Sequence, residues 1–146
     1  MSFMALSKIP NKKSIPIILQ GALVCSKFPS FTYKIVNHHT LVLTGEIRPT
    51  SFSDSYKVEI TYRFRRFPKV KILSHKIPDD APHTFDNNYI CTYYFDYNIW
   101  NSKMRLADVI VPWVADWLNN YELWQVTGEW HGRSHPKHPR RGQNAA

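Results

Sequence analysis

The sequence predicts a single α+β domain, in which one helix precedes an antiparallel β-meander and further helices follow it. Two patterns support this fold class. Apolar residues recur at helical spacing over residues 15–26 and again over residues 104–124. Between them, residues 31–73 alternate between apolar and polar side chains in short runs separated by turn residues. A chain of 146 residues is long enough to bury one such core.

Residues 1–14 are expected to form a flexible N-terminus, and the first helix is expected over residues 15–26. Ser14 is the predicted N-cap. Pro16 is tolerated in the first turn, because an amide there has no partner within the helix. Cys25 lies on the apolar stripe of this helix and is expected in the core.

The meander is expected to contain four strands, over residues 31–35, 41–47, 56–64 and 70–73. The third is the clearest, because its apolar side chains share one face and its charged side chains share the other. Asn37-His38-His39 and Arg65-Arg66-Phe67-Pro68 are predicted turns, and Gly45 is expected to interrupt the second strand. Short loops of this kind join antiparallel neighbours.

Residues 74–100 show little regular pattern, and a segment of this length within a compact domain is usually functional. The helix expected after it, over residues 104–124, contains Pro112, which is predicted to kink or restart it. Gly128 and Gly132 mark its end.

The net charge of +8 is distributed unevenly. Residues 1–78 carry thirteen basic and three acidic groups, whereas residues 79–130 carry two basic and eight acidic groups. Such polarity favours docking to partners of complementary charge or contact with nucleic acid, and ordinary solvated faces are the alternative.

No apolar run approaches the roughly 18 residues that cross a bilayer, and no signal peptide is expected. The chain has only two cysteines, Cys25 and Cys91, so a reducing, cytoplasmic location is expected.

Cys91 is a candidate nucleophile, because a thiolate attacks an activated carboxyl carbon and leaves readily from a thioester. His83 is a candidate for raising the thiolate fraction or for deprotonating an incoming amine. Asp96 is a candidate for orienting that amine. The alternatives are a structural buried cysteine, a surface histidine and a solvated acid.

The order of these parts resembles the ubiquitin-conjugating-enzyme (UBC) fold over roughly residues 15–125. The motifs that carry the resemblance are the strand Tyr56–Tyr62, the Phe67-Pro68 break, the strand Val70–Ile72, and His83, Cys91 and Trp100 at spacings of eight and nine residues.

A closer resemblance is to the bacterial UBC-like proteins of antiphage cyclic-oligonucleotide (CBASS-type) defence operons. Its motifs are His83-Thr84-Phe85, Cys91-Thr92-Tyr93-Tyr94, Val111-Pro112-Trp113, Tyr121–Trp124 and Thr127–Gly132. The resemblance implies a transferase that carries the C-terminus of a cGAS-like CD-NTase synthase on Cys91 as a thioester and passes it to a target amine. His83 would assist and Trp100 would support the loop.

The resemblance leaves two chemical roles unassigned: activation of the donor's carboxyl group and stabilisation of the oxyanion. The chain has no glycine-rich phosphate loop, so the resemblance implies a separate activating enzyme for the carboxyl group or leaves the activation route open, and no cofactor is expected. Eukaryotic UBC proteins have His-Pro-Asn at His83-Thr84-Phe85, so the asparagine that supports the oxyanion is absent here. Asn87 and Asn88 do not match its place, which leaves His83, a backbone N–H or His131 as candidate donors.

Residues 131–146 are expected to form a basic, histidine-rich tail beyond a conjugating domain over residues 15–130. Pro136 and Pro139 exclude a regular helix over His131, His135 and His138, so a metal site is not expected.

Two other functions compete with the transferase. One is a catalytically inactive UBC-like scaffold that binds the synthase. The other is a nucleic-acid-binding module, suggested by a pI of about 9.6.

Overall fold

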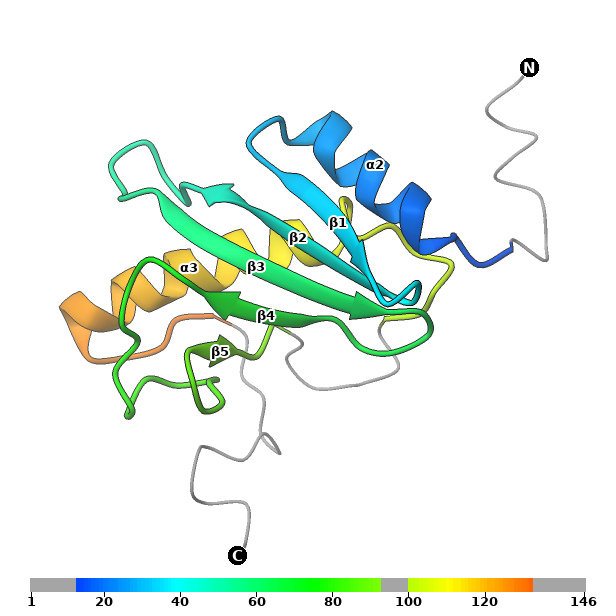
Figure 1. Cartoon of the computed structure of the whole chain (residues 1–146). Helices are drawn as coiled ribbons and strands as arrows, with labels where there is room; N and C mark the ends of the chain where they lie inside the picture. Colours follow the sequence, from blue (N-terminus) through cyan, green and yellow to red (C-terminus); the bar gives the residue numbers. More distant parts are fainter. Residues whose placement is uncertain (1–12, 93–99, 133–146) are drawn as a thin grey trace, which may run out of the picture.

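The structure is a computed structural model that describes residues 13–92 and 100–132. It contains a five-stranded antiparallel sheet, with one helix behind the sheet and one beside its first strand (Figure 1). The elements are α2 (Ile17–Lys27), β1 (Thr32–Val36), β2 (Thr40–Ile47), β3 (Tyr56–Arg63), β4 (Lys69–Ile72), β5 (Tyr89–Ile90) and α3 (Ile110–Thr127). The strands lie in the sheet in their chain order. The predicted α+β class is confirmed, and the order of elements is consistent with a UBC-like fold.

The core lies between the inner face of the sheet and α3. One row of paired residues crosses four strands: Leu43 pairs with Ile60, Ile60 with Val70, and Val70 with Ile90. Each of these side chains is at most 3% exposed. The buried residues of α3 that complete the apolar cluster are Ile110, Val111, Val114, Trp117, Leu118 and Tyr121. Alternation along the strands therefore determines which face of the sheet the helix covers.

Strand β3 confirms the predicted alternation, because the apolar residues from Tyr56 to Tyr62 are at most 3% exposed. Phe64, which was expected on the same face, lies beyond the end of the strand and is 41% exposed. The turn before β2 is also confirmed: Asn37, His38 and His39 connect Val36 to Thr40, and Asn37 and His38 have left-handed φ values of 54° and 63°. Gly45 does not interrupt β2, because it stays in the ladder and leaves room for the ring of Phe31.

Helix α2 begins at Ile17, and its N-cap is Pro16 rather than Ser14. The Ser14 hydroxyl oxygen instead lies 2.6 Å from that of Ser102. Within α2, the fully buried Gln20 donates to the carbonyl of Met104 (2.7 Å) and accepts from the amide of Leu106 (2.9 Å). The helix thus holds the chain segment that leads into α3.

Helix α3 begins at Ile110, so the start predicted at residue 104 is wrong. The preceding segment forms turns, with Met104 N–H donating to Asn101 and Asp108 N–H donating to Arg105. The physical reason is that Gln20 binds the carbonyl of Met104, which a helix starting at residue 104 would pair with the amide of Asp108.

The later start also explains Pro112. The proline falls in the first turn of α3, where an amide has no helical partner, so it neither kinks nor restarts the helix. Gly128 ends the helix as predicted, with a φ of 79° and its N–H on the carbonyl of Trp124 (2.8 Å). Within the described ranges, α3 is the single helix after the sheet, and neither it nor α2 has the length and apolarity to cross a membrane.

Candidate active site

A short hairpin leads into Cys91. Thr84 bridges Ile90, and the amide of Phe85 donates to the carbonyl of Tyr89 (2.8 Å). Asn87 and Asn88 at its tip have φ values of 63° and 65°. Two successive left-handed residues fit a two-residue hairpin turn, for which asparagine is well suited. The irregular segment expected over residues 74–100 therefore contains an ordered hairpin, including strand β5.

The structure places Cys91 directly opposite His83 across this hairpin. The amide of Cys91 donates a 2.9 Å hydrogen bond to the carbonyl of His83. The same carbonyl accepts a 3.1 Å hydrogen bond from Nε1 of Trp117, a residue of α3. The two predicted site residues are thus brought together through their backbones, and α3 fixes their position.

Aromatic rings hold His83 from the other side. Its ring centroid lies 5.1 Å from that of Trp130, which in turn lies 5.5 Å from that of Trp117. His83 has a φ of 55°, a left-handed conformation that a non-glycine residue adopts only when its surroundings enforce it. The two tryptophans and the paired carbonyl supply that enforcement.

Cys91 is 1% exposed, so the accessible thiol that a transferase needs is not open in this conformation. Cys25, which was expected in the core, is half-buried: it packs against the main apolar cluster, and burial raises the pKa of its thiol.

Asn88 has a structural task that occupies its whole side chain. Its Nδ2 donates to the carbonyls of Ile72 (3.0 Å) and His75 (2.6 Å), and its Oδ1 accepts from the amide of Ile77 (3.1 Å). It ties the segment after β4 to the hairpin. An amide that makes these three hydrogen bonds has no remaining donor for an oxyanion.

The chain beyond the site is anchored at Trp100 and Ser102. Trp100 is 6% exposed and meets the ring of Tyr62 edge-on at 5.7 Å, so it lies in the core. The carbonyl of Ser102 accepts a 2.9 Å hydrogen bond from the amide of Ile15. The N-terminal side of α2 therefore fixes the point where the described chain resumes.

Of the remaining predicted candidates, the structure describes only His131. Asp96, His135 and His138 lie outside the described residues. Nε2 of His131 lies 3.2 Å from the hydroxyl oxygen of Thr127 at the exposed end of α3. No set of three His, Cys, Asp or Glu side chains in the described part of the chain is placed to hold a metal ion.

Sequence reasoning gave no role in the site to Asn88, Trp117 or Trp130. Trp117 is in the core, but it also binds the carbonyl of His83. The run Asp86-Asn87-Asn88 between two aromatic residues was an available signal for the hairpin. The contact between His83 and Trp130 joins residues 47 positions apart, and no local pattern predicts it.

A family model described as "E2-CBASS: Type II CBASS E2 protein" matches residues 20–139 of this chain. The match includes every described element from the middle of α2 to α3 and both Cys91 and His83. No curated protein sequence matches the chain.

Proposed function

Because the chain belongs to the type II CBASS E2 protein family, we propose that it is an E2-type acyltransferase that carries a protein C-terminus on Cys91. The observation that carries this proposal is the pairing of Cys91 with His83 in a chain of that family. The proposed donor is the CD-NTase synthase of the same antiphage system. The proposed conjugating unit spans residues 15–130, because Trp130 still packs on His83.

The proposed reaction has two acyl transfers. The Cys91 thiolate attacks the carboxyl carbon of a donor that a separate enzyme has activated as an acyl adenylate or a thioester, and AMP or the enzyme's thiol leaves. A target amine then attacks the thioester carbon, the C–S bond breaks, and an amide forms. The Cys91 thiolate is regenerated, and the ammonium proton passes to a base.

His83 is the proposed base, since its backbone position beside Cys91 is fixed by Trp117 and Trp130. The sulfur of Cys91 must become exposed for either transfer, because its residue is 1% exposed. Asp96 keeps its proposed role in orienting the amine.

The geometry weakens one backbone donor for the oxyanion, because the amide of Cys91 already donates to the carbonyl of His83. The side chain of Asn88, which does not match the place of the family's asparagine, is fully engaged. The imidazoles of His83 and His131 or another backbone N–H are the proposed donors, and substitution of each histidine by alanine tests the first two.

The decisive experiment compares the wild type with Cys91→Ser and Cys91→Ala, each co-expressed with the synthase and its operon neighbours. Intact mass and a non-reducing gel are expected to show a synthase-sized adduct on the wild type that thiol cleaves. Cys91→Ser should give an alkali-sensitive ester, and Cys91→Ala should give no adduct. Cys25→Ser is the control, because it removes the other thiol and should leave the adduct intact.

The second candidate function is a scaffold that binds the synthase without carrying it. The burial of Cys91 and the missing oxyanion asparagine favour this reading. Co-purification of the synthase with no adduct in any variant would establish the scaffold and reject the transferase.

A further inference from the structure

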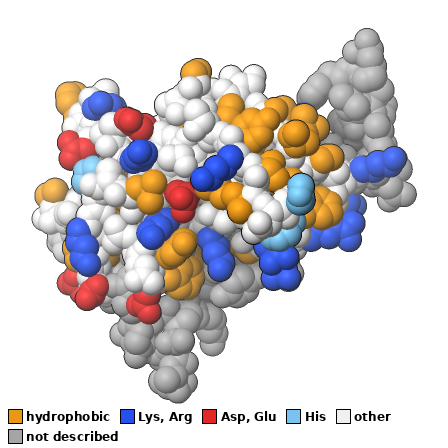
Figure 2. Space-filling view, viewed as in Figure 1, with side chains coloured by type: hydrophobic (Ala, Val, Ile, Leu, Met, Phe, Trp, Pro, Cys, Tyr) orange, Lys and Arg blue, Asp and Glu red, His pale blue; other side chains and the backbone are white. Residues whose placement is uncertain are grey.

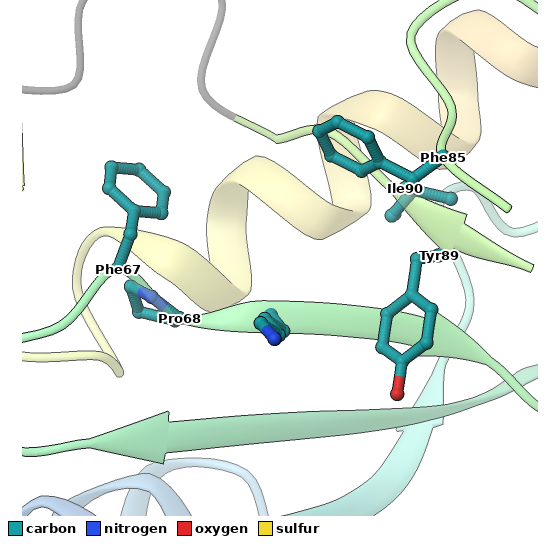
Figure 3. A pocket seen from close by; sticks show the side chains of 6 residues that line it. Phe67, Pro68, Phe85, Tyr89 and Ile90 are labelled. Atoms are coloured by element: carbon teal, nitrogen blue, oxygen red, sulfur yellow. The ribbon is translucent and has the colours of Figure 1, made fainter. Parts of the chain in front are cut away.

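An apolar pocket opens on the same hairpin that carries Cys91. Its volume is about 370 Å³, and its lining residues are Phe67, Pro68, Lys69, Phe85, Tyr89 and Ile90. Phe67 and Pro68 from the β3–β4 turn stand at one end, and Phe85 and Ile90 stand at the other, with Tyr89 below (Figure 3). Phe85 is 36% exposed. A pocket of this size, formed mainly by aromatic and aliphatic groups, fits one or two apolar side chains.

Basic side chains border this pocket on the outer face of the sheet. Lys69 and Phe67 also line a second hollow of about 360 Å³, together with Arg63 and Arg66. On β4, Nζ of Lys71 lies 5.4 Å from the ring centroid of Tyr89. Figure 2 shows Lys and Arg side chains recurring over the face of the molecule that carries the outer side of the sheet.

The basic side chains at this rim make no ion pair within the described part of the chain, where no carboxylate lies within ion-pair distance of Arg63, Arg66 or Lys69. An apolar pocket bordered by such cations is complementary to a peptide that combines an apolar side chain with carboxylates. A neutral or basic segment could make the apolar contacts in the pocket but would not be attracted by the basic side chains at its rim.

The pocket lies within reach of a chain that ends at Cys91. Ile90 lines the pocket and directly precedes Cys91, and Cα atoms of neighbouring residues are about 3.8 Å apart. A bound extended chain spans about 3.3–3.6 Å per residue. A side chain in the pocket would therefore precede the transferred carboxyl group by only a few residues.

We propose that this pocket and its basic rim bind an extended, acidic and apolar segment immediately before the C-terminus of the protein donor. The inference rests on the proposed function for the identity of the donor, and it adds where the donor is held and by which chemistry. An apolar donor side chain fills the space between Phe67 and Phe85. Donor carboxylates face Arg66 and Lys69.

A photo-crosslink tests the position of the donor. Phe85→p-benzoyl-phenylalanine is introduced into the Cys91→Ala chain, so that no thioester is needed, and the complex with the full-length synthase is irradiated. Mass spectrometry is expected to place the crosslink within about the last 15 residues of the synthase. A crosslink to its folded domain, to a second copy of this chain, or to nothing in an intact complex would overturn the proposal.

Charge reversal tests the rim. Arg66→Glu and Lys69→Glu are expected to weaken synthase binding by about tenfold or more, with a marked dependence on salt. Lys57→Glu is the matched control, because Lys57 is an exposed cation at the opposite end of β3, and it should stay within about twofold of the wild type. Equal losses in all three variants would reject a local site. A loss of binding to a 20-base single-stranded DNA, with synthase binding unchanged, would assign the rim to nucleic acid instead.

The two proposals fail separately. If the crosslink and the charge effects are found but no thiol-sensitive adduct forms in the Cys91 wild type, the docking site stands and the transferase is rejected. If the adduct forms and the Lys69→Glu chain forms it as fast as Lys57→Glu at limiting synthase, the docking site is rejected and the transferase stands.

Discussion

The carbonyl of His83 accepts both the amide of Cys91 at 2.9 Å and the indole Nε1 of Trp117 at 3.1 Å. One backbone oxygen thus connects the candidate nucleophile to the central helix α3. The position of Cys91 depends on a buried aromatic contact as well as on its own hairpin. The hairpin, the packing and the thiol can be tested separately.

Asn88→Ala should lower the free energy of unfolding by about 2–4 kcal/mol, because it removes three hydrogen bonds and leaves their backbone partners unpaired. Asn87→Ala is the matched control. Asn87 has nearly the same φ, so both variants carry the strain of a left-handed alanine, about 1–2 kcal/mol. Urea denaturation of both variants measures the difference between their free energies of unfolding. Equal losses would mean that the side-chain hydrogen bonds of Asn88 contribute nothing.

Gly45→Ala should destabilise the fold by about 1–3 kcal/mol, since the added methyl group meets the ring of Phe31 in a buried strand. Phe31→Leu in the same chain should recover part of the loss. Gly128→Ala has open space around it and should lose only about 1 kcal/mol, from its left-handed backbone. Thermal unfolding of the wild type, Gly45→Ala, Gly45→Ala with Phe31→Leu, and Gly128→Ala measures these changes in stability. A Gly45→Ala chain as stable as the wild type would contradict the close packing of Phe31 on Gly45.

Stability should fall as the pH rises above about 10, the usual pKa of tyrosine. Burial, followed by the hydrogen bond to Glu122 at 2.8 Å and the charge of Glu122, raises the pKa of Tyr56 far above that value. Burial also raises the pKa of Tyr62 and Tyr121. The folded state therefore keeps protons that the unfolded chain loses, so the unfolded state binds fewer protons and unfolding becomes easier with increasing pH.

Absorbance at 295 nm measures this ionisation. Of the eight tyrosines, the three buried ones should ionise only when circular dichroism shows unfolding. Glu122→Gln should bring the pKa of Tyr56 down toward its usual range, because it removes the carboxylate charge. Ionisation of all eight near pH 10 in a folded chain would contradict the burial.

Cys91 should react with iodoacetamide about two orders of magnitude more slowly in the folded Cys25→Ser chain than in guanidinium, because it is 1% exposed. Addition of the synthase should accelerate the reaction if binding uncovers the thiol. Intact mass against time measures the rate. Fast alkylation of the protein without the synthase would show that the thiol is open before the partner arrives.

The sequence predicted those parts of the fold that depend on local patterns. The alternation from Tyr56 to Tyr62, the Asn37-His38 turn and the end of α3 at Gly128 are each determined by a few neighbouring residues, and each is confirmed. The predicted start of α3 was wrong because the true start depends on a contact of Gln20, which lies 86 positions before Leu106.

In the candidate site, too, contacts between residues far apart in the sequence were not predicted. The backbone hydrogen bond from Cys91 to His83 joins the two residues that the family resemblance singled out, and their catalytic roles stay predictions. Trp130 was given no role, because its contact with His83 depends on where α3 ends relative to the hairpin. The burial of Cys91 was given only as the alternative to an open nucleophile, since a thiol in an irregular segment has no pattern that indicates its exposure.

The contacts of Gln20 with Met104 and Leu106 also set an order of events during protein synthesis. They join positions 84 and 86 residues apart, so they cannot form until nearly three quarters of the chain has left the ribosome. Until then α2 lacks the backbone groups that its buried amide requires, while the meander β1–β4 can already pair. Helix α2 thus completes the hydrogen bonds of its buried amide only after the strands that follow it have been made.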